Sequence, residues 1–355
     1  MTEADRGTRL TKVAAICAAF CVSAPAAMAQ GEGWSELDIV PVTTSPVPIK
    51  QVPPLYPNEA IRRSQEGWVL INFCIETDGS VSNPAVIDAG DYRGLFAKNA
   101  LAAIKKWKFK QQLVDGLPQR FCNKEYMITF ALGGEGGRRE FGRKNDEIVK
   151  LIKANRLAEA RTLIDSAFAD ELNLYEVDRL NLLEGVFYVA KRDDIGTIRA
   201  LSRAALGGHL GREEYAFLYR NLFEAQFRRG LYVRALVTFG KLEKWERVRA
   251  GDPILASIDE IAGKRAAPEG FVVAAAIDSQ GQGWESPHYV YRPLRHEIGI
   301  KNVMGSIDHL SLRCDGIEAE TEYEPGWRAR ISREWGACSL FVFGAPETTF
   351  QIVEY

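Results

Sequence analysis

A fixed order of short signals between residues 53 and 109 constrains the fold of this chain more than any other feature. Prolines come first and favour a stiff, extended backbone, because each proline fixes its own φ and restricts the residue before it. An Asp-Gly pair and an aromatic pair follow. In chain order the signals are Pro53-Pro54, Pro57, Gly67, Asp78-Gly79 and Trp107-Lys108-Phe109. This order predicts a stiff leading segment, a hairpin and a helix closed by aromatic side chains.

The residues between these signals alternate as in strands or recur as in helices. From Gly67, apolar side chains fall on every second position, which predicts a strand. Asp78-Gly79 tolerates the positive φ of a tight hairpin turn. The expected elements are a short helix over 59–64, a strand from 67, a strand over 81–87, a helix over 92–106 and a strand over 121–132. The order β-β-α-β predicts a three-stranded antiparallel sheet with its helices on one face.

Over about residues 46 to 133, the segment resembles the C-terminal domain of the TonB family of energy transducers. Members of that family typically show Tyr-Pro and a downstream Ala, Gly-x-Val before a strand, Asp-Gly in the hairpin, and Trp-x-Phe after an Ala-Leu helix. The matching residues here are Tyr56, Pro57, Ala60, Gly67, Val69, Phe73, Asp78, Gly79, Ala100, Leu101, Trp107 and Phe109. The sequence departs from the pattern at Asp88-Ala89-Gly90 and at Lys110-Gln111.

The resemblance implies a peptide-binding function. Such domains take an extended peptide of an outer-membrane transporter onto the edge of their last strand, where unpaired backbone groups supply affinity. The implied binding edge comprises Lys124, Glu125, Tyr126, Met127, Ile128, Thr129 and Phe130. The plainer alternative is that these residues are only half-buried sheet.

The N-terminus predicts export. Arg6, Arg9 and Lys12 precede an apolar stretch that ends in Ala27-Met28-Ala29, so residues 1–29 resemble a signal peptide cleaved between Ala29 and Gln30. The expected location is the periplasm. The alternative is an uncleaved inner-membrane anchor over 13–29, which an energy transducer needs to reach its motor. The proline-containing linker over 30–52 is short: its proline-rich part, 41–54, spans only about 40–45 Å as polyproline II.

The cysteine count agrees with export. Outside the signal segment four cysteines remain, and an even number in an exported chain predicts disulfides. Three pairings are possible, and we expect Cys74–Cys122 with Cys314–Cys338 because each bond then stays inside one domain. Cys74 and Cys122 fall on opposite faces by strand alternation. The first pair therefore needs a β-bulge near residues 123–125.

A Gly-rich linker over 133–142 separates the TonB-like region, 53–132, from a helical region over 143–265. Turn-like positions recur there about every 37 residues, at Asn155-Arg156, Arg192-Asp193 and Arg229-Gly230. This spacing indicates paired helices of weak tetratricopeptide-like character within 143–250. A plain helical bundle is the alternative. Such a region serves either as a scaffold for a partner peptide or as a rigid spacer.

Short strands punctuated by Gly, Pro and Asp predict a small all-β, sandwich-like domain over 268–355. The expected strands are 271–277, 309–314, 328–332, 338–343 and 348–353. The domain is acidic, since residues 266–355 carry 7 Lys and Arg against 13 Asp and Glu. Glu318, Glu320, Glu322 and Glu324 alternate, which indicates a solvated strand face or, less simply, a weak cation-binding edge.

Motifs of enzymes are absent from the sequence, so we expect no catalytic residues, no metal site and no cofactor. Its His residues show no metal-ligand spacing, and no nucleophile elbow or phosphate-binding glycine loop is present. A net charge of −2 argues against nucleic acid as a partner. The chain is predicted to be an α+β multidomain protein of one of two functional classes. One is a TonB-like transport component, with motor components as further partners if the anchor is retained. The other is a non-energised periplasmic scaffold that binds envelope proteins or cell-wall glycan.

Overall fold

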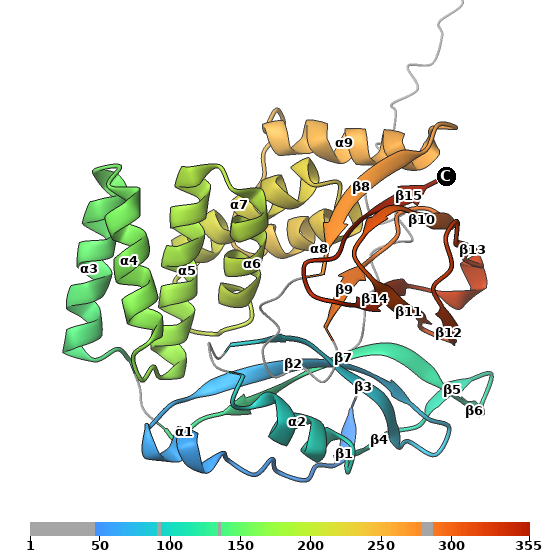
Figure 1. Ribbon diagram of the computed structural model, residues 1–355, viewed down its shortest axis with the longest axis horizontal. Coiled ribbons are helices and arrows are strands. Elements are labelled where there is room, and N and C mark those ends of the chain that lie inside the picture. The colour runs from blue at the N-terminus through green and yellow to red at the C-terminus, as the bar shows by residue number, and fades with distance from the viewer. Residues whose placement is uncertain (1–46, 91–93, 134–135, 278–286) are drawn as a thin grey trace, which may run out of the picture. The chain divides into compact units, whose positions relative to one another are not determined.

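The computed structural model describes residues 47–90, 94–133, 136–277 and 287–355 (Figure 1). The expected signal peptide, the Ala29–Gln30 cleavage site and most of the expected linker lie outside the described residues. In the described part of the chain no helix is both long enough and apolar enough to cross a membrane.

The first region contains the expected β-β-α-β order and its antiparallel sheet, with strand order β3-β2-β7. Figure 1 shows α1 and α2 on one face of this sheet. The principal elements are α1 (Asn58–Arg62), β2 (Gly67–Ile75), β3 (Val81–Ala89), α2 (Ala97–Ile104) and β7 (Phe121–Phe130). The two helices are shorter than expected, and the three strands begin at the predicted residues.

The face of the sheet that α1 and α2 cover is called the inner face here. Its apolar residues include Val69, Ile71 and Phe73, all fully buried in one cluster with Phe96 and Phe109. Burying a side chain of this size stabilises the fold by about 1.5–3 kcal/mol. The alternating pattern of β2 therefore predicted this core correctly.

Two small pairings in the first region were not expected. β1 (Pro48–Lys50) pairs with β4 (Lys108–Phe109), so part of the predicted linker is a strand. β5 (Gln112–Val114) and β6 (Leu117–Gln119) form a second hairpin. Asp115 and Gly116 turn this hairpin with φ of 51° and 80°. The same Asp-Gly signal that located the first hairpin would have located this one.

The middle region consists of helices that pair in sequence. They are α3 (Arg139–Lys153), α4 (Leu157–Phe168), α5 (Leu174–Lys191), α6 (Asp194–Ala204), α7 (Arg212–Arg228), α8 (Tyr232–Leu242) and α9 (Pro253–Ala266). Left-handed residues lie at Asn155, Arg192 and Gly230, the predicted turns between α3 and α4, α5 and α6, and α7 and α8. Because α3 starts at Arg139, its first turn lies inside the segment expected to be a linker.

The last region is a β domain of two four-stranded antiparallel sheets, with orders β13-β10-β15-β8 and β12-β11-β14-β9. Its strands are β8 (Phe271–Ala276), β9 (His288–Tyr291), β10 (Glu297–Met304), β11 (Ile307–Cys314), β12 (Glu318–Glu322), β13 (Arg328–Arg330), β14 (Cys338–Gly344) and β15 (Thr349–Glu354). Cys314 and Cys338 form a disulfide across β11 and β14, as expected.

Two of these strands, β9 and β10, were missed from the sequence, whereas the alternating glutamates had indicated a strand face at β12. β10 contains Gly299 and a left-handed Asn302, both of which weaken a strand pattern. Pairing with β15 on one side and β13 on the other keeps it extended. Long-range pairing therefore decided β10.

Candidate functional site

The aromatic residues of the sequence pattern hold the first region together. The Tyr56 ring lies edge-on to Phe96 and Phe130, and its hydroxyl donates to the backbone oxygen of Gln65 at 2.8 Å. Burial, followed by the charge of Glu66, raises the pKa of Tyr56 to about 12, so the hydroxyl stays protonated. These contacts make Tyr56 a structural residue.

Trp107 and Phe109 close the helix end against the leading segment. The Trp107 indole donates from Nε1 to the backbone oxygen of Val52 at 2.8 Å, and the Phe109 side chain is fully buried. Pro57 immediately precedes α1, and Ala60 is fully buried within it. The aromatic pair predicted from the sequence therefore joins the end of α2 to the leading segment at Val52.

The first hairpin depends on Asp78 and Gly79. The Asp78 carboxylate accepts from the backbone N–H of Ser80 at 2.8 Å and pairs with Lys108 Nζ at 2.7 Å. These bonds, led by the one from Lys108, hold the pKa of Asp78 well below its usual range. Gly79 has a φ of 79°, and a Cβ there would lie 2.3 Å from the backbone oxygen of Phe109. Only glycine fits this turn without a shift of the backbone.

The predicted binding edge is β7, one of the two outer strands of the sheet. It pairs with β2 on one side, with Val69 opposite Ile128 and Trp68 opposite Thr129. Ile128 and Phe130 are buried in the core, whereas Thr129 is exposed. Tyr126 and Met127 are half-buried. The position of the strand suits strand addition, because the outermost strand of a sheet has unpaired backbone groups.

The N-terminal half of β7 is already engaged by the β domain of the same chain. Lys124 Nζ lies 3.3 Å from Asp315 Oδ1, and Arg292 donates to the carboxylate of Glu125. Asn123 Nδ2 donates to the backbone oxygen of Ala337 at 3.3 Å. Nothing in the sequence indicates these contacts, which link residues far apart in the chain.

The face of the sheet opposite α1 and α2, here called the outer face, is buried as well. Trp68 is only 1% exposed, and Asn72 and Cys74 are fully buried. A Cβ at Gly90 would collide with the Trp68 indole, at 2.2 Å from Nε1. The close packing of Trp68 therefore requires a residue without a side chain at position 90. Gly90 belongs to Asp88-Ala89-Gly90, where the sequence departs from the family pattern.

A network of hydrogen bonds, here called the polar cluster, joins the outer face to the β domain. Asn72 accepts from Arg313 Nη1 at 3.1 Å and donates to Asn123 Oδ1 at 3.2 Å. Arg313 pairs with Glu318 at 3.0 Å, and Arg120 donates to the other Glu318 oxygen at 2.7 Å. The members of the polar cluster are Asn72, Arg120, Asn123, Arg313 and Glu318.

Two members of the polar cluster are charged and deeply buried. The side chains of Arg313 and Glu318 are each 4% exposed. Burial lowers the pKa of Arg313, and the charge of Glu318 opposes this shift. The Arg313 guanidinium also lies 4.4 Å from the centre of the Phe341 ring. The expectation that Glu318 belongs to a solvated strand face is therefore wrong, because β12 turns this carboxylate toward the outer face.

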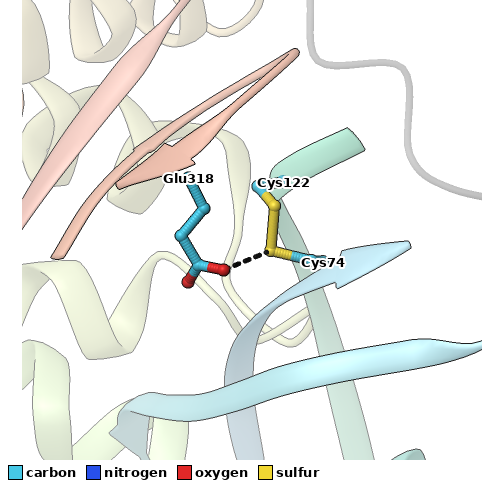
Figure 2. A group of neighbouring side chains, drawn as sticks. All are labelled: Cys74, Cys122 and Glu318. Atoms are coloured by element: carbon cyan, nitrogen blue, oxygen red, sulfur yellow. Dashed lines mark hydrogen bonds between the residues drawn. A yellow bond between two sulfur atoms is a disulfide. The ribbon is translucent and has the colours of Figure 1, made fainter. Parts of the chain in front are cut away.

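Glu318 also reaches the disulfide of the first region, as Figure 2 shows. Cys74 and Cys122 are bonded, and Glu318 Oε2 lies 3.5 Å from Cys74 Sγ. The expected bulge is present: Asn123 has a φ of 57° and the register shifts beside it. Among the described residues, these two cysteines and Glu318 come together as a group of metal-ligand types. The sulfurs offer no thiolate while they are bonded to each other.

Comparisons with known proteins identify relatives for one part of the chain. Residues 52–132 match the family model described as the Gram-negative bacterial TonB protein C-terminal. Residues 52–132 are a TonB C-terminal domain. The match covers less than a quarter of the chain, and the helical region and the β domain lie outside it.

The TonB C-terminal domain has relatives among characterised proteins and solved structures. Protein TonB of Vibrio cholerae is 34% identical over 68 residues, which are 19% of this chain and 28% of that protein. The chain thus spans little more than a quarter of this relative. The solved TonB2 protein of Vibrio anguillarum shares 31% identity, with 26% of this chain and 87% of that chain covered and a TM-score of 0.22. The TonB C-terminal domain of Pseudomonas aeruginosa shares 25% identity, with coverages of 27% and 92% and a TM-score of 0.21.

Proposed function

We propose that the TonB C-terminal domain captures an extended peptide of an outer-membrane transporter by adding it as a strand to β7. The observation that carries this proposal is the strand order β3-β2-β7, in which β7, one of the two outer strands, is paired on one side only among the described strands. An incoming peptide would complete the backbone hydrogen bonds of that edge. The two disulfides and the predicted signal peptide support a periplasmic location, in which the protein takes part in TonB-dependent transport.

The contacts along β7 favour its C-terminal half as the binding segment. Lys124 and Glu125 are bonded to the β domain. From Tyr126 to Phe130, no side chain is hydrogen-bonded to the β domain within the described residues, and Thr129 is exposed. A peptide would therefore pair along Tyr126–Phe130, and the side chains of this segment would set its register.

The test is to remove one backbone donor from this edge. Thr129→Pro deletes an N–H group and adds a ring that obstructs a neighbouring strand, whereas Thr129→Val keeps the donor and a β-branched shape. Synthetic peptides from transporter N-terminal segments are titrated calorimetrically. We expect Thr129→Pro to weaken binding about tenfold or more, as expected for a lost hydrogen bond plus a steric clash. Near-ultraviolet circular dichroism checks that both variants are folded. Equal affinities of two folded variants would refute strand addition at this edge.

A second function is supported by the contacts between β7 and the β domain. The chain's own β domain engages Asn123, Lys124 and Glu125 through side-chain contacts, so a protein surface can occupy part of this strand without adding a strand to the sheet. Such a protein would be a non-energised periplasmic scaffold that binds other envelope proteins. The mature N-terminus separates the two functions. Sequencing that starts at Gln30 favours the scaffold, whereas retention of Met1 in the membrane fraction favours an energy transducer.

A further inference from the structure

A cavity of about 540 Å³ lies where the end of α9 meets the β domain. Its walls come from the end of α9 and the two residues after it, from the segment leading into β10, and from β13 and the residues that follow. The basic and acidic residues that line it are Arg265, Arg295, His296, Glu297, Arg330 and Arg333. A cavity of this volume lies within the range of about 300–1,000 Å³ typical of small-molecule sites.

The charge of this cavity is opposite to that of its domain. Residues 266–355 carry 7 Lys and Arg against 13 Asp and Glu. Three of those basic residues, Arg295, Arg330 and Arg333, line the cavity, and α9 adds Arg265. Glu297 is the one acidic residue in this lining. Such a concentration of guanidinium groups in an acidic domain produces a local positive potential that favours an anion.

The four arginines are not equally committed to structural contacts. Arg295 is buried and donates to the backbone oxygens of Lys264 and Glu269. Arg330 lies 3.4 Å from Glu297 and is otherwise exposed. Arg265 and Arg333 have no ion pair with an acidic residue in the described part of the chain. Two guanidinium groups in the lining are therefore left to bind a ligand.

The pKa of His296 is lowered by burial and also by the positive charge of the cavity lining. Burial lowers the pKa of its imidazole, and the charges of Arg333 and Arg265 lower it further. An anion bound among these groups would offset the two arginines and raise the pKa again. The imidazole is thus a spectroscopic probe placed within the cavity lining.

The backbone around the cavity is fixed by buried hydrogen bonds. The Glu354 carboxylate accepts from the N–H groups of Leu294 and Arg295, at 2.9 and 2.5 Å. The N–H of Ile331 donates to the backbone oxygen of His296 at 2.6 Å. A site whose backbone is already ordered loses less conformational entropy when it binds a ligand.

We propose that this cavity binds a phosphate-bearing ligand, with the phosphate at Arg265 and Arg333 and the remainder of the ligand over the apolar side chains of Leu294 and Ile331. The planar guanidinium matches the oxygens of a phosphate with two parallel hydrogen bonds. The cavity is much larger than one phosphate, and its lining combines arginines with buried apolar residues. A phosphate attached to a larger organic group therefore fits better than free phosphate.

The first experiment uses the full chain and inorganic pyrophosphate as the probe. Calorimetry measures its affinity for the wild type and for Arg265→Ala, Arg333→Ala and Arg143→Ala. Arg143 is an exposed residue of α3, so its variant removes the same charge at a distant place. We expect each cavity variant to weaken binding about tenfold or more, the loss typical of one charge-assisted hydrogen-bonded pair. Arg143→Ala should bind as the wild type does.

Two further measurements distinguish a site from diffuse electrostatic attraction. Glu297→Gln removes the acidic group from the lining and should tighten pyrophosphate binding several-fold. The His296 imidazole, followed by nuclear magnetic resonance, should show a higher pKa when pyrophosphate is bound. Equal losses in the cavity variants and in Arg143→Ala, or no measurable binding to the wild type, would overturn the proposal.

Lipid vesicles distinguish a phosphate carried by a lipid headgroup from a phosphate carried by a soluble ligand. Phosphatidylcholine vesicles with and without phosphatidic acid are compared in a co-sedimentation assay, with pyrophosphate as competitor. Sedimentation that needs phosphatidic acid and is lost in Arg333→Ala would assign a lipid headgroup to the cavity. Pyrophosphate binding without sedimentation would assign a soluble phosphorylated ligand. Both results support the site, whereas sedimentation unchanged by Arg333→Ala would count against it.

Discussion

The inner and outer faces of the sheet β3-β2-β7 are both buried, but they are held by different interactions. The inner face packs Val69, Ile71 and Phe73 against α1 and α2 in an apolar cluster. The outer face places Asn72 and the Cys74–Cys122 disulfide against a buried ion pair of the β domain. The same strand, β2, supplies alternate residues to both.

This difference shows how local and distant partners stabilise a sheet. Apolar burial is non-directional and tolerates many partners, so the inner face depends mainly on volume and packing. Buried charges must be paired and hydrogen-bonded, because desolvation of each ion otherwise costs several kcal/mol. The outer face is therefore specific for one partner surface, the β domain with Arg313 and Glu318. The following experiments test this contrast.

The largest effect is expected from a cavity in the inner face. Phe73→Ala should lower the free energy of unfolding by about 3–5 kcal/mol, since it removes a fully buried ring from the core. Phe73→Leu is the matched control and should cost far less. Chemical denaturation followed by fluorescence measures both. A loss below about 1 kcal/mol for Phe73→Ala would show that the inner face does not support the sheet.

Breaking the ion pair of the outer face should cost slightly less. Glu318→Leu leaves Arg313 buried without its carboxylate, and we expect a loss of about 3 kcal/mol in the same denaturation experiment. The double variant Arg313→Met/Glu318→Leu should recover most of this loss, because it leaves no buried charge unpaired. An equal loss in the single and double variants would contradict the view that pairing, rather than packing, holds the outer face.

The disulfide on the outer face should contribute about 2–4 kcal/mol, because it closes a long loop in the unfolded chain. The variant Cys74→Ala/Cys122→Ala should lower the melting temperature. Cys314→Ala/Cys338→Ala, which opens the shorter loop of the β domain, is the matched comparison and should have the smaller effect. The reverse order would show that loop length does not govern the two contributions.

The smallest effect is expected from acid at Glu76, whose carboxylate accepts a hydrogen bond from Arg120 of the polar cluster. Burial by itself raises the pKa of Glu76, but hydrogen bonds from Ser82 and Arg120 outweigh it and hold the pKa below its ordinary value. Ionised Glu76 therefore adds stability above pH about 4.5, and this contribution is lost as the pH falls through its pKa in the folded protein.

Because Glu76 is partly exposed, its contribution should stay below about 1 kcal/mol. The variant Glu76→Gln should show a flatter decline in stability between about pH 5 and pH 3 than the wild type does. Denaturation curves over that range measure the difference. An identical decline in both proteins would exclude a contribution of Glu76 to the acid response.

Much of the TonB C-terminal domain was predictable because its determinants are close together in the sequence. The alternation of β2, the Asp78-Gly79 turn and the Trp107-Lys108-Phe109 motif are each visible within a few residues of sequence, although Trp107 bonds to Val52, 55 positions away. The turns at Asn155, Arg192 and Gly230 were located for the same reason. β10 was missed because its sequence is weak as a strand and partners distant in the chain keep it extended.

The candidate site was predicted only in part. The sequence indicated β7 as the outermost strand and required a bulge near Asn123, and the structure contains both. It did not indicate that Lys124 and Glu125 meet Asp315 and Arg292. Nothing in the alternation of Glu318 with its neighbours separates a solvated carboxylate from a buried one. That distinction depends on which surface lies opposite the strand.

Local sequence patterns were sufficient to predict the principal elements of the TonB C-terminal domain and its apolar core, because turn chemistry and hydrophobic periodicity act over a few residues. Contacts between residues far apart in the chain set what covers the outer face, how much of β7 remains accessible, and which arginines line one cavity. These features join residues up to 244 positions apart, as Cys74 and Glu318 are. Charge pairing at such separations produces no periodicity in the sequence. The identity of a charged residue does not reveal whether its partner is water or a distant side chain.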